Sequence, residues 1–205
     1  NGCTSPGAQQ FVNVRPTPAT DFTVQSPLCL GQPSTITYNG QASSAAIFNW
    51  NFAGGTVHSG NNQGPFSVSW NSPGTKNVFL TVSENGCTGR VTNKPVTVLA
   101  NPTGNFTIGS PICAGQPTTV TYTGTAANTA QYQWDFAGAT VLSGTGQGPY
   151  SIRWDNPGNY ALSLLVNEQG CNSAAYTAIA LVNPEPIAQF VLVGPVCTGE
   201  ATTVS

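Results

Sequence analysis

Residues 131–158 carry the pattern that decides the fold, and they read QYQWDFAGATVLSGTGQGPYSIRWDNPG. Tyr132, Trp134 and Phe136 alternate with polar residues, as in a β-strand with one buried and one solvent-facing side. A glycine-rich segment follows, and it is long enough to turn the chain. The end of the stretch shows the same alternation with a second apolar set, Tyr150, Ile152 and Trp154. The stretch therefore predicts two half-buried strands.

The same pattern occurs earlier in the chain. Residues 47–74 read IFNWNFAGGTVHSGNNQGPFSVSWNSPG, and the two copies align without a gap. Each aromatic residue at the aligned positions lies on the apolar side of an alternating strand. We therefore predict hydrophobic cores rather than a sugar-stacking surface for these side chains. The predicted core aromatics are Trp50, Phe52, Trp70, Trp134, Phe136 and Trp154.

The six cysteines show how far the duplication extends. They form two series, Cys3, Cys87, Cys171 and Cys29, Cys113, Cys197. Every step within a series is 84 residues (87−3, 171−87, 113−29 and 197−113). Solenoid repeats are about 20–50 residues long, whereas this period is sufficient for a small domain with its own core. The sequence therefore predicts complete domains repeated in tandem.

Composition favours an all-β protein and argues against two classes of partner. Charged residues are 6% of the chain, glycine and proline number 23 and 16, and no long stretch has a helical apolar stripe. Five basic residues and a net charge of −2 argue against nucleic-acid binding, which needs a basic patch. No apolar run approaches the roughly 20 residues that cross a bilayer. We expect neither nucleic acid nor membrane insertion for this segment.

Cysteine usage indicates an oxidising compartment and therefore secretion. Six cysteines at a fixed period, in a chain with few lysines, are typical of disulfide-containing extracellular proteins. A cytosolic zinc protein is the competing interpretation. The sequence disfavours it, because there is no Cys-x-x-Cys pair and because Leu142 replaces the only histidine, His58, in the second copy.

The period divides the chain into repeats, each expected to form a two-sheet sandwich of about seven short strands. The expected boundaries are 1–18 for the closing strand of a preceding repeat, 19–102 and 103–186 for two complete repeats, and 187–205 for the opening strands of a further repeat. Prolines in 15–18, 101–102 and 183–186 predict short, stiff linkers, since each proline restricts φ.

Few residues are of the types that catalysis or metal binding needs. Asp135 and Asp155 are carboxylates that asparagine replaces in the first copy, and one histidine cannot complete a repeated triad. Asp21, Asp135 and Glu84 lack the Asp-x-Asp-x-Asp loop that supplies calcium with about six to eight oxygens. A glycosylation sequon begins at Asn105, but Asp21 holds the equivalent position. We predict no enzyme, metal site or cofactor.

The motif Trp-Asn-Phe-Ala-Gly at 50–54 and its copy Trp-Asp-Phe-Ala-Gly at 134–138 resemble the PKD (polycystic kidney disease) domain. A Pro-Gly turn before an alternating strand and a terminal Asn/Gln-Gly-Cys hairpin extend the resemblance to the whole chain. The typical family motif is Trp-Asp-Phe-Gly-Asp-Gly, from which this sequence departs at Ala53 and Ala137. The segment from Ser59 to Trp70 is closer to the PKD-like variant of large bacterial surface proteins, often adhesins.

The resemblance implies tandem immunoglobulin-like (PKD-like) β-sandwich domains. PKD modules serve as spacers, stalks and adhesive arrays, so fold alone does not select the function. We favour a structural extracellular repeat protein, such as a stalk, adhesin arm or filament, that gives length and stiffness at a cell surface. Its expected partners are further copies of the repeat in cis and in self-association. The alternative is a spacer or carbohydrate-binding module of a secreted glycan-degrading enzyme.

The residues alone leave three disulfide pairings open, namely Cys29–Cys87, Cys87–Cys113 and Cys29–Cys171. The strand order implied by the resemblance favours the last. It places Cys29 and Cys87 at opposite ends of one sandwich, roughly 20–25 Å apart, whereas bonded cysteines have Cα atoms about 5.5 Å apart. In a head-to-tail array, Cys29 then approaches Cys171 across the junction. The resemblance implies partners outside this sequence for the other cysteines, Cys3, Cys87, Cys113 and Cys197.

Overall fold

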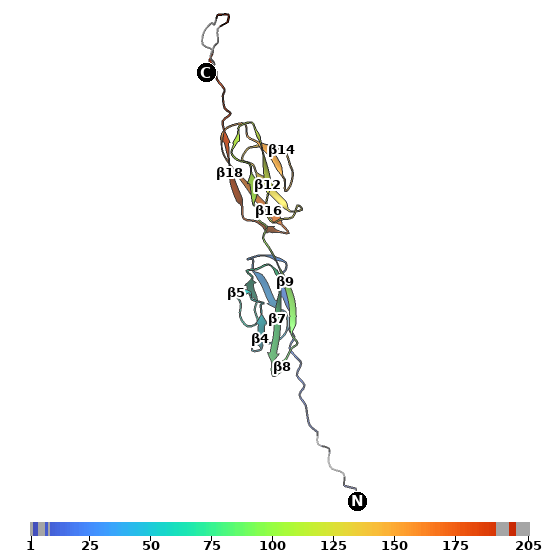
Figure 1. Ribbon diagram of the computed structural model, residues 1–205. Helices are drawn as coiled ribbons and strands as arrows, with labels where there is room; N and C mark the ends of the chain where they lie inside the picture. The colour runs from blue at the N-terminus through green and yellow to red at the C-terminus, as the bar shows by residue number, and fades with distance from the viewer. Residues whose placement is uncertain (1, 4–6, 8, 192–196, 200–205) are drawn as a thin grey trace. The chain divides into compact units, whose positions relative to one another are not determined.

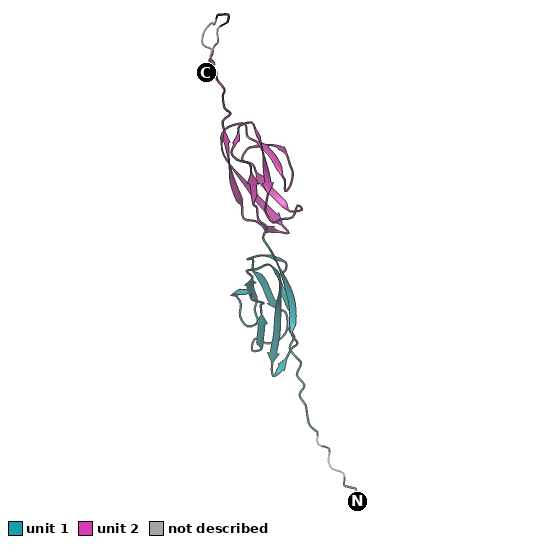
Figure 2. Ribbon diagram, viewed as in Figure 1, with its two compact units in different colours: residues 1–101 teal, residues 102–205 magenta. Residues whose placement is uncertain are grey.

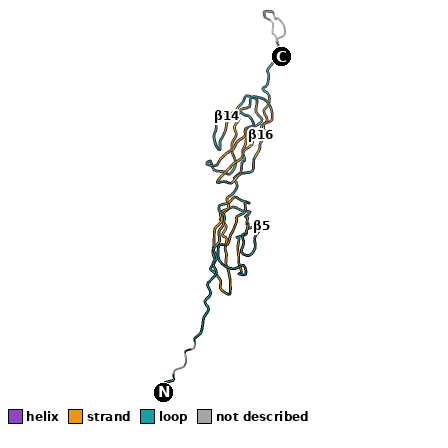
Figure 3. Tube along the Cα trace, turned by 180° about the vertical axis from the view of Figure 1, so that it is seen from behind, coloured by secondary structure: helices purple, strands orange, loops and turns teal. Residues whose placement is uncertain are grey.

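A computed structural model describes residues 2–3, 7, 9–191 and 197–199. The chain divides into two compact units, unit 1 with residues 1–101 and unit 2 with residues 102–205 (Figure 2). Both units consist of strands and loops, and the described residues contain no helix (Figure 3). Accordingly, this part of the chain has no helix that is long and apolar enough to cross a membrane.

Unit 1 is a sandwich of two sheets (Figure 1). Its strands are β1 (Phe22–Val24), β2 (Leu28–Cys29), β3 (Ser34–Tyr38), β4 (Ile47–Asn51), β5 (Thr56–Ser59), β6 (Phe66–Ser69), β7 (Gly74–Glu84), β8 (Cys87–Thr88) and β9 (Thr92–Leu99). One sheet has the order β1-β3-β6-β5, and the other has the order β2-β9-β7-β4 with β8 paired to β7. Adjacent strands are antiparallel except β2 and β9, which are parallel.

Unit 2 repeats this topology with sheets β10-β12-β15-β14 and β11-β18-β16-β13, where β17 pairs with β16. Its strands are β10 (Phe106–Ile108), β11 (Ile112–Cys113), β12 (Pro117–Tyr122), β13 (Gln131–Asp135), β14 (Thr140–Ser143), β15 (Tyr150–Arg153), β16 (Gly158–Glu168), β17 (Cys171–Asn172) and β18 (Tyr176–Asn183). Each strand lies 84 residues after its counterpart in unit 1, and only β12 begins one residue early. Each unit is an immunoglobulin-like β-sandwich.

The two aromatic strands of each repeat are not neighbours. In unit 1, Trp50 of β4 pairs with Leu80 of β7, whereas Phe66 of β6 pairs with Ile36 of β3. The glycine-rich turn therefore carries the chain from one sheet to the other. This connection includes the edge strand β5. The sequence pattern did not predict β5, because all four of its side chains are exposed and the strand therefore has no alternation of apolar and polar residues. The additional strands β2 and β8 are two residues long.

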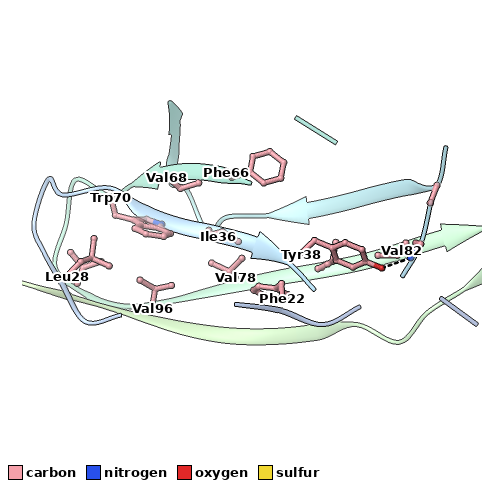
Figure 4. Packing of buried hydrophobic residues seen from close by; sticks show 14 residues of the cluster. Phe22, Leu28, Ile36, Tyr38, Phe66, Val68, Trp70, Val78, Val82 and Val96 are labelled. Atoms are coloured by element: carbon pink, nitrogen blue, oxygen red, sulfur yellow. Dashed lines mark hydrogen bonds between the residues drawn. The ribbon is translucent and has the colours of Figure 1, made fainter. Parts of the chain in front are cut away.

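The core of unit 1 lies between its sheets (Figure 4). Inward residues of β7 and β9 face Ile36, Val68 and Trp70 from the opposite sheet, and Figure 4 shows these side chains converging. The fully buried set in unit 1 includes Phe22, Ile36, Val68, Val78, Leu80, Val82, Val96 and Val98. Unit 2 has the equivalent core, with Val120, Ile152, Leu162, Leu164 and Val166.

The predicted core aromatics divide into two groups. Trp70 and Trp154 are buried, and each indole N–H donates to a backbone carbonyl. Trp50 and Trp134 are half-buried, because β4 and β13 are edge strands, and they donate to carbonyls of the glycine-rich loop at 3.0 Å. Each of these two indoles stacks on the phenylalanine two residues ahead, Phe52 or Phe136. All six side chains pack on the cores.

One packing contact has different residues in the two repeats, and the larger residue on one side is matched by a glycine on the other. In unit 1, a Cβ on Gly89 would meet the Pro18 carbonyl and lie 2.8 Å from the Thr20 methyl group. In unit 2, Ser173 takes the place of Gly89 and Gly104 takes that of Thr20. The Ser173 hydroxyl accepts a hydrogen bond from the Val166 N–H at 3.0 Å. Each repeat therefore has one glycine at this contact, which is Gly89 in unit 1 and Gly104, on the opposite side of the contact, in unit 2.

We expect Leu80→Ala to reduce the free energy of unfolding of unit 1 by about 3 kcal/mol, because it leaves a cavity between the sheets. Phe79→Ala is the matched control, since Phe79 is the next residue of β7 and is 36% exposed, whereas Leu80 is 0% exposed. Its cost should stay below about 1 kcal/mol. Calorimetric unfolding distinguishes the two, and equal losses would contradict the assigned faces of β7.

We expect Gly89→Ser to destabilise unit 1 by about 1–3 kcal/mol through overpacking. Adding Thr20→Gly should recover part of this loss, because the pair then reproduces the arrangement of unit 2. The measurement is a double-mutant cycle on the free energy of unfolding, with an expected coupling of about 1 kcal/mol. Additive effects of the two substitutions would show that the contact is not compensated.

Candidate functional site

Cys29 lies at the end of unit 1 where the chain leaves it. It belongs to β2, which pairs in parallel with the last residues of β9, so that Cys29 is the register partner of Leu99. The Leu30 N–H donates to the Leu99 carbonyl at 2.8 Å, and the Asn101 side-chain amide donates to the Leu30 carbonyl at 3.3 Å. These bonds hold the β2 turn against the departing chain.

Cys87 lies at the other end, where the chain enters unit 1. It pairs with Glu84 in the β7–β8 hairpin, whose turn residues Asn85 and Gly86 have positive φ of 52° and 81°. This is the hairpin geometry that the Asn-Gly dipeptide predicts. The Cys87 Sγ is 4.0 Å from the carbonyl of Arg15, and the Arg15 guanidinium donates to the Asn85 carbonyl at 3.4 Å.

The length of β7 separates these two cysteines. Gly74 pairs with Val98, next to the Leu99–Cys29 pair, and Glu84 pairs with Cys87 at the far end of the strand. Ten residues of extended chain span about 33 Å at roughly 3.3 Å each, whereas bonded cysteines have Cα atoms about 4.4–6.8 Å apart. A bond between Cys29 and Cys87 is therefore excluded in this fold.

Unit 2 presents its cysteines in the same two places. Cys113 of β11 pairs with Asn183 at the end of β18, and Cys171 of β17 pairs with Glu168 at the end of β16. The eleven-residue β16 lies between them. Among the described cysteines, Cys29 and Cys171 are in the disulfide state. The free thiols are Cys3, Cys87, Cys113 and Cys197.

Hydrogen bonds hold the entry end of each unit. In unit 1, the Tyr38 hydroxyl donates to the Ala19 carbonyl at 2.8 Å and accepts from the Ala42 N–H at 3.2 Å, the bond drawn in Figure 4. The Glu84 carboxylate accepts from the Ser43 N–H at 3.0 Å. In unit 2, Tyr122 makes the same pair of bonds to Thr103 and Ala126, and Glu168 accepts from Ala127 at 2.9 Å.

These contacts also set the electrostatics of the entry end. Hydrogen bonds from the hydroxyl and backbone N–H of Ser43 lower the pKa of Glu84. A hydrogen bond and the charge of Lys94, 2.9 Å away, lower the pKa of Asp21. In unit 2, burial raises the pKa of Tyr132, whose hydroxyl donates to the Ala127 carbonyl at 2.8 Å.

A shallow groove of about 330 Å³ lies beside the hairpin in both units. In unit 1 its lining includes Ser43, Ile47 and the Ser83–Gly86 hairpin. In unit 2 it includes Thr129, Gln131 and the Asn167–Gly170 hairpin. Both linings include one glutamate together with hydroxyl or amide side chains, and the unit 1 lining also includes the apolar side chain of Ile47. No aromatic side chain is among the lining residues given by the structure in either groove.

The residues considered for catalysis and metal binding have local structural contacts. The Asp135 carboxylate accepts from the Ala137 N–H at 2.8 Å, and Asn51 makes the same bond to Ala53 at 2.9 Å. Either side chain supports a turn whose alanine has positive φ. Asp155 pairs with Arg153 at 2.8 Å. Within the described ranges, no three His, Cys, Asp or Glu residues gather in a group that could hold a metal ion.

His58 and Asn105, the first residue of the sequon, also make local contacts within their units. The His58 ring is 2.7 Å from the Ser69 hydroxyl across β5 and β6. Asn105 is exposed directly before β10, and its carbonyl accepts from the Thr123 N–H at 2.8 Å. Where unit 1 has the Asp21–Lys94 ion pair, unit 2 has Asn105 and Ala178. Unit 2 therefore lacks both charges of this ion pair, and the sequence pattern did not indicate that the two residues are partners.

No family model matches the chain. No curated protein sequence matches it either. Solved structures with a similar fold include the eight N-terminal immunoglobulin domains of DSCAM isoform 1.30.30, at TM-score 0.48 and 13% identity over 83% of this chain and 25% of that one. Invasin, a bacterial integrin-binding protein, is similar at TM-score 0.44 and 12% identity over 91% and 44%.

The D1–D4 ectodomain fragment of ICAM-5 is similar at TM-score 0.45 and 18% identity, over 83% of this chain and 48% of that one. This chain therefore spans about a quarter to a half of the length of these structures. The sheet orders of the two units, rather than this likeness, show that the chain is a tandem of immunoglobulin-like β-sandwiches.

We expect acid to remove the stabilising contribution of the Glu84 charge. The pKa of Glu84 is lowered in the folded state, so its contribution is complete above the usual glutamate pKa of about 4.3 and is lost as pH falls through the lowered value. Wild type should have the higher melting temperature than Glu84→Gln at pH 7, and the gap should close below about pH 4. Calorimetry of unit 1 across this range measures the gap.

The control is Glu185→Gln, which removes an exposed carboxylate beyond β18. It should leave the melting temperature of unit 1 unchanged at every pH. A gap between wild type and Glu84→Gln that persists at low pH would show that the Ser43 contact does not depend on the charge.

Proposed function

We propose that this chain belongs to an extracellular tandem-repeat structural protein, a stalk, adhesin arm or filament, that supplies length and stiffness at a cell surface. The proposal rests on one observation, which is that the chain enters and leaves each unit at opposite ends. The chain enters unit 1 beside Cys87 and leaves beside Cys29, at opposite ends of β7. A protein built from such units gains length with every repeat, as repeat arrays do.

We further propose that the units are PKD-like repeats, with complete copies at 19–102 and 103–186. Support comes from the motif at Trp50–Gly54 and its copy 84 residues later. In both, an Asn or Asp side chain accepts from the N–H of the alanine two residues on, and this alanine and the glycine after it have positive φ. The first acidic position of the family motif, which is Asp135 here, therefore has a structural contact, and Asn51 makes the same hydrogen bond in the first copy.

Stiffness needs a restraint between successive units, and we propose a Cys29–Cys171 disulfide as that restraint. The argument uses repeat equivalence. The carbonyl of Arg15 is 4.0 Å from the Cys87 Sγ. Leu99 occupies the same position before unit 2 (99−15 = 84), and Cys171 replaces Cys87. Leu99 is also the register partner of Cys29. We therefore infer that Cys29 and Cys171 both lie beside Leu99.

This bond would close a loop of 142 residues (171−29). In the chain-entropy model, a loop of this length stabilises the folded state by up to about 5 kcal/mol. Stable disulfides of this kind form in oxidising compartments, which supports an extracellular location. A catalytic role has no support in the local contacts of the acidic residues, so we propose that the chain is not an enzyme.

Surface location is tested on cells that express the chain naturally. We expect antibodies against residues 1–205 to label intact cells, and external protease to remove the epitope. Labelling only after lysis would contradict the proposal. Specific, saturable binding to cellulose, chitin or arrayed glycans would instead favour a carbohydrate-binding module of a secreted enzyme.

The disulfide is tested by peptide mapping without reduction. We expect a cross-linked peptide with Cys29 and Cys171, and we expect Cys29→Ser to lower the free energy of unfolding by up to about 5 kcal/mol. Cys87→Ser is the matched control, because Cys87 is a free thiol at the other end of unit 1, and it should leave the protein's stability nearly unchanged. A Cys29–Cys87 peptide would contradict both the pairing and the fold.

A further inference from the structure

We propose that Asn85 is a site of spontaneous modification, at which the Gly86 nitrogen attacks the Asn85 side-chain amide and water then converts this amide to a carboxylate. The two residues form the turn of the β7–β8 hairpin at the entry end of unit 1. The reaction needs no enzyme or oxidant, because the two reacting groups belong to adjacent residues of one chain. It is independent of the proposed array, since it concerns the chemistry of a single turn.

Three Asn-Gly pairs occur in the sequence, at 1–2, 39–40 and 85–86. A glycine after the asparagine favours this reaction, because it has no Cβ to obstruct the approach of its nitrogen to the preceding side chain. Asn1 lies outside the described residues. The other two pairs have different surroundings, and these surroundings select Asn85.

The Asn85-Gly86 turn is open. Both residues are exposed, and a Cβ added to Gly86 would meet no atom within 4 Å beyond its chain neighbours. Among the described residues, neither the Asn85 side chain nor the Gly86 N–H has a hydrogen-bond partner. The one bond at Asn85 is to its backbone carbonyl, which accepts from Arg15 at 3.4 Å. Both reacting groups are therefore accessible.

The Asn39-Gly40 pair is held more firmly. The Asn39 N–H donates to the Asp21 carbonyl at 2.9 Å. A Cβ on Gly40 would overlap the ring of Tyr38, whose hydroxyl is itself fixed by two hydrogen bonds. The packed ring leaves little room for the backbone rotation that ring closure needs. We therefore expect Asn39 to react more slowly than Asn85 in the folded protein.

The hairpin turn can rotate toward the reactive conformation by a local opening. Strand β8 has two residues, and its pair nearest the turn is Glu84–Cys87. Release of the turn breaks this one register pair and leaves the buried part of β7 in place. Such an opening costs less free energy than unfolding of the whole unit. The reaction can therefore proceed from the folded protein.

Unit 2 has the same turn with a different side chain. Gln169 and Gly170 have φ of 51° and 82°, close to the 52° and 81° of Asn85 and Gly86. Glutamine is one methylene longer than asparagine, so the same attack must close a larger ring, which is a slower reaction. The modification is therefore expected in unit 1 and not at the equivalent turn of unit 2.

The reaction has two steps. The Gly86 nitrogen loses its proton to a solvent base and bonds to Cγ of Asn85, the Cγ–Nδ2 bond breaks, and ammonia leaves with a proton returned by solvent. Water then opens the cyclic imide. Cleavage of the bond from the Gly86 nitrogen to Cγ gives aspartate, and cleavage of its bond to the Asn85 backbone carbonyl carbon gives isoaspartate. One water is consumed and one ammonia released, with no change of oxidation state.

Either product alters the groove beside the hairpin. The groove lining in unit 1 includes Glu84, Asn85 and Gly86. The new carboxylate therefore adds a negative charge next to Glu84, at a turn that Arg15 also contacts. Isoaspartate also lengthens the backbone of the two-residue turn, which displaces the Glu84–Cys87 pair. Modified and unmodified copies thus differ in charge and geometry at the entry end of unit 1.

The test incubates the full chain at mildly alkaline pH and maps it with trypsin after reduction. Cleavage after Lys76 and Arg90 isolates residues 77–90, in which Asn85-Gly86 is the one Asn-Gly pair. This peptide should gain the mass difference between an amide and a carboxyl group and should separate into two products of equal mass. The rate should rise with pH, because the attacking nitrogen must lose its proton.

A comparison of the folded and denatured chain tests the role of the structure. In the folded protein, Asn85 should convert at least several-fold faster than Asn39, which fragmentation of peptide 1–76 distinguishes from Asn1. In denaturant, Asn39 and Asn85 should convert at similar rates. Equal rates in the folded protein would overturn the proposal, and so would an unmodified Asn85 in the folded protein when the denatured chain reacts.

Two substitutions exchange the turns between the units. Asn85→Gln should abolish the mass gain of peptide 77–90, and a gain that persists would place the reaction at Asn77 and contradict the assignment. Gln169→Asn should create a second site in peptide 154–205 that reacts at a rate similar to that of Asn85, because the turn is the same. No reaction at that position in the folded variant would show that the open turn is not what makes Asn85 reactive.

Discussion

The long pairing of β7 with its neighbours is the constraint on which each unit depends. Its eleven residues pair with β9 on one side and β4 on the other, and they continue into the hairpin with β8. Its inward residues Val78, Leu80 and Val82 are fully buried. The same strand therefore supplies the centre of the core and sets the distance between the two ends of the unit.

Two consequences follow from that single strand. A disulfide within one unit is excluded, because the two cysteines pair with residues near its opposite ends. Chain entry and exit are also separated, because the entering segment runs past the hairpin while β9 returns along β7 and leaves at the other end. This geometry supports the proposed role, in which successive units lengthen the chain.

The two repeats serve as an internal comparison of which interactions the fold requires. The core and the hydrogen bonds of the entry end are present in both units. The Asp21–Lys94 pair is present only in unit 1, and the glycine at the Gly89 contact changes sides. Core packing and the tyrosine hydrogen bonds are thus retained, whereas an exposed ion pair is dispensable, as expected from the small net energy of surface salt bridges.

The sequence by itself determined the fold class, the period and the inward faces of the main strands, because alternation and turn residues are local signals. Trp70 and Trp154 were assigned to the core by spacing alone, and both are buried. The tertiary structure decided what depends on partners distant in the chain. It placed the aromatic strands in opposite sheets, left Trp50 half-buried on an edge strand and formed β5 without any apolar alternation. It also set the separation of Cys29 from Cys87, since the length of a strand depends on the neighbours that pair with it.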